Sequence, residues 1–117
     1  MSPRESRDAE TVADLIEACG QIIGFTGSAE ETAFYRNPET KFATLYQILV
    51  LGEAVKRLSS DIRERYPEVP WQDIAGMRDR LTHTYDDINL REVWRTSQYD
   101  VPLLLEQLLR IRADLAE

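Results

Sequence analysis

The sequence predicts an all-α protein, an up-and-down bundle of four main helices and one short helix. Apolar residues recur three and four positions apart along most of the 117-residue chain. Glycine and proline are few, with five of each, and no long stretch alternates apolar and polar residues as half-buried strands do. The length suits a single domain over residues 1–117, with residues 1–7 expected to form a flexible N-terminus.

The first two helices are predicted from one apolar stripe and the residues that end it. This stripe starts after Asp8 and has the spacing of a helix face: Val12, Leu15, Ile16, Cys19, Ile22 and Ile23. Gly24 and Gly27 follow the stripe, as is typical of a helix end. A short helix with Ser28 as its N-cap is expected next, and Asn37-Pro38 ends it.

A long helix is expected from about Glu39 to Ser59 or beyond, at the centre of the bundle. Its apolar face is too wide for a surface helix: Phe42, Leu45, Ile48, Leu49, Leu51, Val55, Leu58 and Ile62. Gly52 lies inside this helix, where glycine costs about 1 kcal/mol relative to alanine. Its presence therefore indicates a close approach of another helix. Tyr46 lies on a helical stripe, like Trp71 and Trp94, and is expected in the core.

Two further helices complete the predicted bundle. Pro70 suits the first turn of a helix whose inner stripe is Trp71, Ile74, Met77 and Leu81. Residues 86–89 read as a turn, and Asn89 is expected to cap the last helix. Pro102 lies inside that last helix and is expected to kink or split it near Asp100, because proline cannot donate a backbone hydrogen bond.

Charge and cysteine content exclude several classes of protein. Fourteen Lys and Arg against 21 Asp and Glu give a net charge of −7, unlike the basic surplus of a general nucleic-acid binder. Cys19 is the single cysteine, so an internal disulfide and a cysteine-based metal cage are excluded, and plain packing is expected for it. No stretch approaches the ~20 apolar residues of a membrane span, and no signal peptide is evident. A cytoplasmic protein is therefore expected.

Candidate chemistry lies at the end of the fourth helical pattern, between Arg78 and Tyr85. His83 is the single histidine, so no histidine cluster is available, and no Glu-x-x-His ligand pair is present. A carboxylate-only metal site stays open, but neither a metal nor a cofactor is expected. Asp79 and His83 are four residues apart and share a helix face, so the carboxylate can orient the imidazole. Arg78 and His83 point about 140° apart on a straight helix. They converge only if the helix end distorts or two copies pack about a two-fold axis. The plain alternative is a polar helix end, where a cationic histidine interacts well with the helix dipole.

The segment Arg78-x-x-x-x-His83-x-Tyr85 resembles the signature of HEPN-domain proteins. It is most similar to that of the HepT-type toxins, the partners of small MNT nucleotidyltransferase antitoxins in prokaryotes. Residues 51–59 and 66–71, together with Val93-Trp94, are similar to family segments in the same order and spacing. The resemblance covers roughly residues 8–112.

This resemblance implies an all-α homodimer of the HEPN fold, with the motif lining a cleft at the dimer interface. It implies the toxin of a type VII-like toxin–antitoxin system, a metal-independent endoribonuclease that cuts tRNA or mRNA through attack of the RNA 2′-OH. His83 would then be the acid/base group, Arg78 would hold the scissile phosphate, and Asp79 would orient both. Tyr85 would be the tyrosine to which the antitoxin transfers AMP, which would block the cleft with a bulky negative group.

Three aspartates depart from what an RNA site favours. Asp79 stands where the family often has asparagine, and Asp86 and Asp87 add negative charge beside the motif. RNA binding would therefore depend on a local set of basic residues: Arg80, Lys56 and Arg57, with Arg63 and Arg65. The alternative for this set is a solvated charged face. Two other functions stay open: a HEPN dimer that has lost cleavage and docks to a nucleotidyltransferase, and a generic helical interaction protein.

Overall fold

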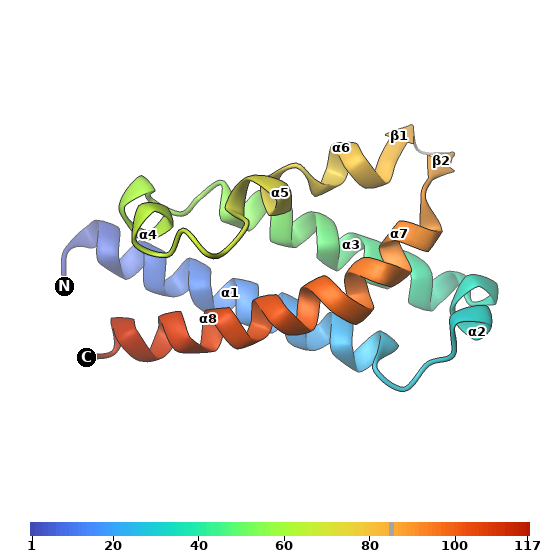
Figure 1. Cartoon of the computed structure of the whole chain (residues 1–117), viewed down its shortest axis with the longest axis horizontal. Helices are drawn as coiled ribbons and strands as arrows, with labels where there is room; N and C mark the ends of the chain where they lie inside the picture. Colours follow the sequence, from blue (N-terminus) through green and yellow to red (C-terminus); the bar gives the residue numbers. More distant parts are fainter. Residues whose placement is uncertain (85) are drawn as a thin grey trace.

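The computed structural model describes residues 1–84 and 86–117. Most of them are helical, which confirms the all-α prediction. The chain runs up and down the long axis of a molecule of 46 × 28 × 21 Å (Figure 1). Helix α1 (Pro3–Thr26) forms the first leg and α3 (Pro38–Val55) the second. The third leg is built from α5 (Trp71–Ala75) and α6 (Met77–Leu81), and α8 (Val101–Leu115) dominates the fourth.

Helix α1 begins at Pro3, earlier than its apolar stripe predicts. The Ser2 hydroxyl accepts a hydrogen bond from the Glu5 backbone N–H, and the Glu5 carboxylate accepts one from the Ser2 backbone N–H. The latter bond favours the ionised form and lowers the pKa of Glu5. This capping box satisfies backbone donors at the helix start. Residues 3–7, expected outside the helix, therefore form its first turns.

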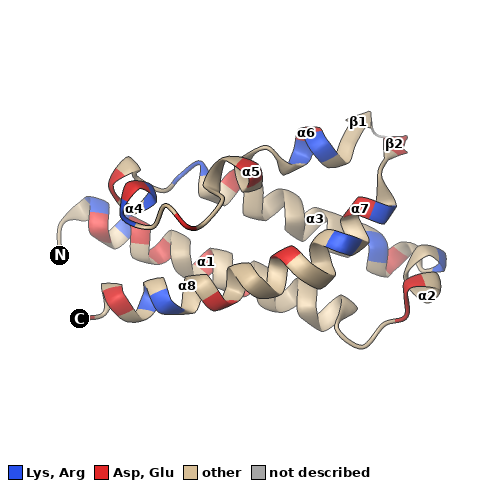
Figure 2. Ribbon diagram, in the orientation of Figure 1, with Lys and Arg blue, Asp and Glu red and all other residues tan. Residues whose placement is uncertain are grey.

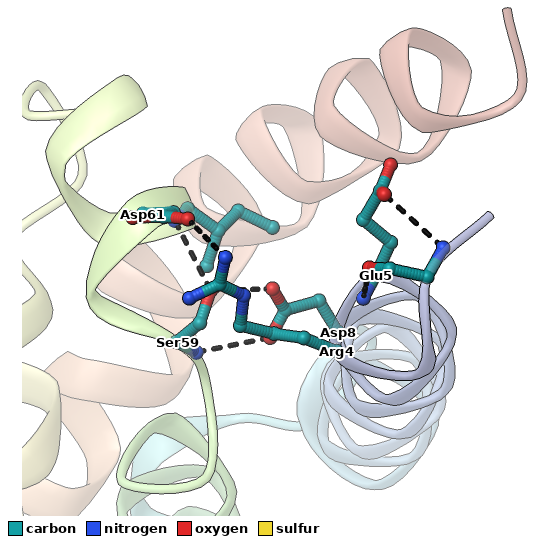
Figure 3. Close-up of polar contacts among 7 residues, drawn as sticks. Arg4, Glu5, Asp8, Ser59 and Asp61 are labelled. Carbon is teal, nitrogen blue, oxygen red and sulfur yellow. Dashed lines mark hydrogen bonds and ion pairs between the residues drawn. The ribbon is translucent and has the colours of Figure 1, made fainter.

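A polar junction joins α1 to α4 (Ser60–Arg65) (Figure 3). The buried Asp8 carboxylate accepts hydrogen bonds from the Ser59 backbone N–H at 2.9 Å and from the Ser59 hydroxyl at 2.5 Å. The Ser59 oxygen also accepts from the Ile62 N–H and so caps α4, and Arg4 pairs with Asp61 at 3.0 Å. The prediction that the long helix reaches Ser59 is therefore wrong. Helix α3 ends at Val55, and Ser59 begins a new helix instead of continuing α3.

Helix α3 packs along α1 and against α5 and α6. A Cβ on Gly52 would lie 3.0 Å from the backbone oxygen of Ile74, which confirms the close approach predicted at this glycine. Trp71 is buried and donates its indole N–H to the Tyr66 carbonyl. The prediction that Phe42 and Tyr46 belong to the core is wrong. They are 50% and 64% exposed, because α1, α5 and α6 leave the outward face of α3 uncovered.

The helix ends follow local capping chemistry. Helix α2 (Glu31–Arg36) follows Glu30 and has no side-chain cap, so the predicted cap at Ser28 is wrong. Asn37 ends α2 and accepts from the Thr40 N–H to cap α3. Asn89 accepts from the Glu92 N–H and caps α7 (Leu90–Arg95), as predicted.

The fourth leg of the bundle contains a π-helical turn just before its proline. Between α7 and α8 lies η1 (Thr96–Asp100), a single π-helical turn that ends just before Val101-Pro102. The break falls at the predicted place, since Pro102 cannot donate to the preceding turn and a widened turn accommodates its ring. Among the described residues, every helix is too short or too polar to cross a lipid bilayer.

Candidate active site

Helix α6 ends abruptly between Arg78 and His83. The chain becomes extended at β1 (Thr82–Thr84), which pairs with β2 (Asp87–Ile88) in a short antiparallel ladder. The Thr82 backbone N–H and hydroxyl both donate to the Arg78 carbonyl, and the Asn89 N–H donates to the Leu81 carbonyl at 2.8 Å. The prediction that Asp79 and His83 share a helix face is therefore wrong, because His83 lies on a strand. The helix end distorts, which is one of the two conditions for convergence of Arg78 and His83.

Arg78, Asp79 and His83 line one open groove. Helix α6 supplies the arginine and the aspartate, and β1 supplies the histidine. The groove has a volume of about 510 Å³. Its remaining lining is partly apolar and comes from α3 and the strands: Phe42, Leu45, Leu49, Thr82, Thr84 and Ile88. We call this the motif groove. Tyr85 lies outside the described residues.

The three polar side chains of the motif groove are exposed and have no structural task within the described chain. Arg78, Asp79 and His83 make no side-chain hydrogen bond to another described residue, so the expected contact from Asp79 to His83 is not formed. An exposed guanidinium can grip a phosphate through two N–H groups. An imidazole in contact with a substrate can accept or donate a proton. Together they can bind and cleave a phosphodiester.

The other predicted RNA-binding residues lie elsewhere on one chain. Arg80 lines a separate groove between α5, α6 and α8. Arg57 lines a groove between α1 and α3, and Lys56 pairs with Glu53 at 3.2 Å. Basic residues of α6 and α7 mark the end of the molecule that carries the two strands, whereas the arginines of α4, Arg63 and Arg65, lie at the opposite end (Figure 2). A single chain therefore does not bring its basic residues together around the motif.

The apolar wall of the motif groove was not predicted as part of the site. Phe42, Leu45 and Leu49 read in the sequence as core of the central helix, and the sequence signal was only the unusual width of that apolar face. Cys19 offers no alternative nucleophile, because it is fully buried and burial raises the pKa of its thiol to about 12. The described residues contain no group of three or more His, Cys, Asp or Glu side chains placed to share a metal ion.

The structure thus defines a class of protein, a small up-and-down helical bundle with an exposed arginine and histidine on a helix-to-strand corner. The sequence matches the family described as Ribonuclease HepT-like over residues 15–111. The chain belongs to this HEPN-type family.

Its relatives include several archaeal proteins of similar length. The Methanocaldococcus jannaschii protein named "Putative RNase MJ1216" is 38% identical over 87% of this chain and 84% of its own length. "Putative RNase MJ0125" from the same organism is also 38% identical, over 89% of this chain and 90% of its own. "Probable ribonuclease HepT" of Thermococcus cleftensis is 33% identical over 85% of this chain and 90% of its own. No solved structure is significantly similar to the chain.

Proposed function

We propose that this protein is an endoribonuclease and the toxin of a type VII-like HEPN/MNT toxin–antitoxin pair in the cytoplasm. The observation that carries this proposal is the placement of Arg78, Asp79 and His83 in one exposed groove. These side chains make no side-chain hydrogen bond to other described residues, so they are free to contact a ligand. The ribonuclease names of the relatives favour RNA as that ligand.

The proposed chemistry depends on the Arg78 guanidinium and the His83 imidazole. The Arg78 guanidinium binds the non-bridging oxygens of the scissile phosphate and stabilises the charge that grows on them. The RNA 2′-oxygen gives up its proton and attacks phosphorus, and the 5′-oxygen of the next nucleotide leaves and gains a proton. His83 accepts or donates one of these protons. The products are a 2′,3′-cyclic phosphate and a 5′-hydroxyl, and neither a metal nor a cofactor takes part.

A homodimer supports this reaction better than a single chain. Two protons move in the reaction, one from the 2′-oxygen and one to the leaving oxygen, whereas each chain has one histidine. Two copies packed about a two-fold axis supply two His83 and two Arg78 to one cleft. One imidazole then serves as the base while the other serves as the acid.

The antitoxin would act on a residue close to His83 in the sequence. We propose Tyr85 as the residue to which an MNT-type nucleotidyltransferase transfers AMP from ATP, with pyrophosphate leaving. The modification adds a bulky anion two residues from His83, and this charge opposes entry of an RNA phosphate. Tyr85→Phe should therefore stay toxic yet escape neutralisation by modification.

The second candidate is a HEPN dimer without cleavage activity that docks to the nucleotidyltransferase. The exposed acids near the motif favour this candidate. Asp79 lines the groove itself, and Asp86 and Asp87 are exposed between and within the strands. A local negative potential repels phosphate.

The deciding experiment incubates purified protein with total RNA in the presence of a chelator. We expect cleavage products that carry 2′,3′-cyclic phosphate ends, detected by their resistance to ligation until the cyclic phosphate is removed. The His83→Ala variant prepared in parallel should give no such ends. Intact RNA with the folded wild-type protein would favour the docking function, and products from His83→Ala would show a contaminating nuclease or a wrong role for His83.

A further inference from the structure

A second cavity lies between the third and fourth legs of the bundle and shares no lining residue with the motif groove. Its volume is about 140 Å³, the space of about five water molecules at about 30 Å³ each. Its inner wall is apolar and comes from α5, α6 and α8: Ile74, Met77, Val101 and Leu104. We call this space the α6–α8 cavity.

The apolar wall and the volume together limit what the α6–α8 cavity can hold. All four wall residues are buried, so an aliphatic group that enters leaves water for an apolar surface, which is favourable. The volume is well below the roughly 300–1,000 Å³ typical of pockets for drug-sized ligands. The cavity therefore suits one small aliphatic group of about the size of a leucine side chain.

Three exposed charged side chains line the same cavity without neutralising one another. Asp73 comes from α5, Arg80 from α6 and Asp100 from the last position of η1. None of the three takes part in the ion pairs that form among the described residues. A simple amine in the cavity would meet the Arg80 cation, and a simple anion would meet the two aspartates. A ligand that carries both an ammonium and a carboxylate can pair with both signs at once.

Gln107 adds an acceptor to the lining of the cavity. Its side-chain N–H group donates to the Glu68 carbonyl at 3.5 Å, whereas its amide oxygen is buried and has no hydrogen-bond partner among the described residues. A buried polar atom without a partner calls for an explanation, and a donor on a ligand is one. An ammonium carries three N–H donors, which matches the acceptors of Asp73, Asp100 and Gln107. Asp100 belongs to a π-helical turn, and such turns frequently occur at functional sites.

We propose that the α6–α8 cavity binds a free aliphatic α-amino acid of about the size of leucine. The aliphatic side chain fills the apolar part of the cavity, and the α-ammonium is held by Asp73 and Asp100. The Arg80 guanidinium donates two parallel N–H groups to the α-carboxylate. This inference does not rest on the proposed ribonuclease function, because the residues that line the cavity are different from those of the motif groove.

Arg80 favours a free amino acid over the first residue of a peptide. A free carboxylate offers two charged oxygens, which match the planar fork of a guanidinium. The carbonyl of a peptide bond offers one neutral oxygen and leaves the other N–H groups of the fork without a partner.

A ligand series tests each part of the proposed site. Leucine added to the ¹⁵N-labelled protein should shift the backbone amide signals of residues 73–80 and 100–107 in a saturable way, with a dissociation constant in the millimolar range. Leucinamide lacks the carboxylate and N-acetylleucine lacks the ammonium, so each should bind at least about fivefold more weakly. Glycine lacks the aliphatic group and should bind at least about tenfold more weakly.

Three results of this titration would overturn the proposal. They are the absence of a saturable shift with leucine, shifts confined to residues outside the α6–α8 cavity, and equal affinity for leucine and glycine. Leucinamide also represents leucine at the start of a peptide. If it binds more tightly than leucine does, a free amino acid is the wrong ligand.

Two variants assign the charged partners, with Arg36→Gln and Asp14→Asn as matched controls on other exposed positions of α2 and α1. Arg80→Gln should weaken leucine binding at least about fivefold but leave leucinamide binding unchanged, because leucinamide has no carboxylate to lose. Asp100→Asn should weaken leucine binding but leave N-acetylleucine binding unchanged. The controls should bind leucine like the wild type, and all variants should keep the helical content seen by circular dichroism. A folded Arg80→Gln protein that loses the same factor for leucine and leucinamide would contradict the pairing of Arg80 with the carboxylate. RNA cleavage by the wild type is measured separately and does not bear on this outcome.

Discussion

An aspartate at the α1–α4 junction and an aspartate in the motif groove have opposite surroundings. Asp8 is 6% exposed, and its carboxylate oxygens accept two hydrogen bonds from Ser59. Asp79 is exposed and makes no side-chain hydrogen bond to another described residue. A buried carboxylate without partners is costly, so Asp8 must be paired for the fold to form. An exposed one has no such need, so Asp79 is available to orient other groups. Asp8 therefore helps to hold the fold, whereas Asp79 is free to contact a ligand.

Arg78 should give the largest effect on the ligand side of this comparison. We expect Arg78→Ala to lower RNA cleavage about 100- to 1000-fold, the loss typical when one donor to a developing anion is removed. The free energy of unfolding should change by no more than about 0.5 kcal/mol, as for other exposed positions. Arg78→Lys should recover only part of the rate, because an ammonium lacks the two-pronged geometry of guanidinium. Equal rates for the lysine and alanine variants would show that a positive charge alone at position 78 does not speed cleavage.

Replacing Asp8 should have the reverse effect to replacing Arg78, a loss of stability without a loss of activity. Asp8→Ala leaves the Ser59 N–H and hydroxyl without their acceptor, so we expect a loss of about 2 kcal/mol in the free energy of unfolding. Chemical denaturation measures this loss. RNA cleavage by the folded fraction should stay at the wild-type rate, because the junction lies at the end of the molecule opposite the two strands (Figure 1). An unchanged unfolding midpoint would contradict the structural role of Asp8.

Asp79 should give a smaller effect on activity. We expect Asp79→Ala to lower cleavage about tenfold, because His83 and Arg78 lose a group that orients them when RNA is bound. Asp79→Asn keeps an acceptor oxygen and removes the charge, so its rate should equal or exceed that of the wild type. The rate constants are measured under single-turnover conditions. A faster Asp79→Ala variant would mean that the carboxylate only repels RNA.

The smallest expected effect is a change in the pH dependence of unfolding when Tyr66, which pairs with Asp114, is replaced. The Tyr66 hydroxyl donates to Asp114 at 2.7 Å, and burial together with this bond raises the pKa of Tyr66 above its ordinary value. A raised pKa means that the neutral phenol stabilises the fold at pH values below 10 and that this contribution is lost as the pH rises through the folded-state value. Tyr66→Phe should therefore unfold with a weaker dependence on pH above 10. An identical alkaline profile for both proteins would contradict this linkage.

Much of the fold could be predicted from the sequence because local signals govern it. The apolar spacing predicts α1 and α8, Asn89 predicts the start of α7, and Pro102 predicts the break before α8. One error arises where a contact distant in sequence decides the outcome. The central helix ends at Val55, and Ser59 starts α4 instead, with its N–H and hydroxyl held by Asp8, 51 residues earlier. No spacing pattern contains that information.

The candidate site was predictable in its residues and less so in its geometry. Arg78, Asp79 and His83 stand out in the sequence and line one groove in the structure. The extended backbone at β1 follows from pairing with β2, and a helical pattern does not reveal it. Phe42 and Tyr46 read as core because an apolar residue on a helix face gives the same sequence pattern whether or not another helix covers it.

We propose that His83 serves chemistry and has no part in holding the fold. Its most direct test measures one His83→Ala preparation twice, for RNA cleavage with a chelator present and for the free energy of unfolding. We expect cleavage to fall by at least about 100-fold, with an unfolding free energy within about 0.5 kcal/mol of the wild-type value. A variant that still cleaves RNA at the wild-type rate, or one that loses activity only because it unfolds, would contradict the claim.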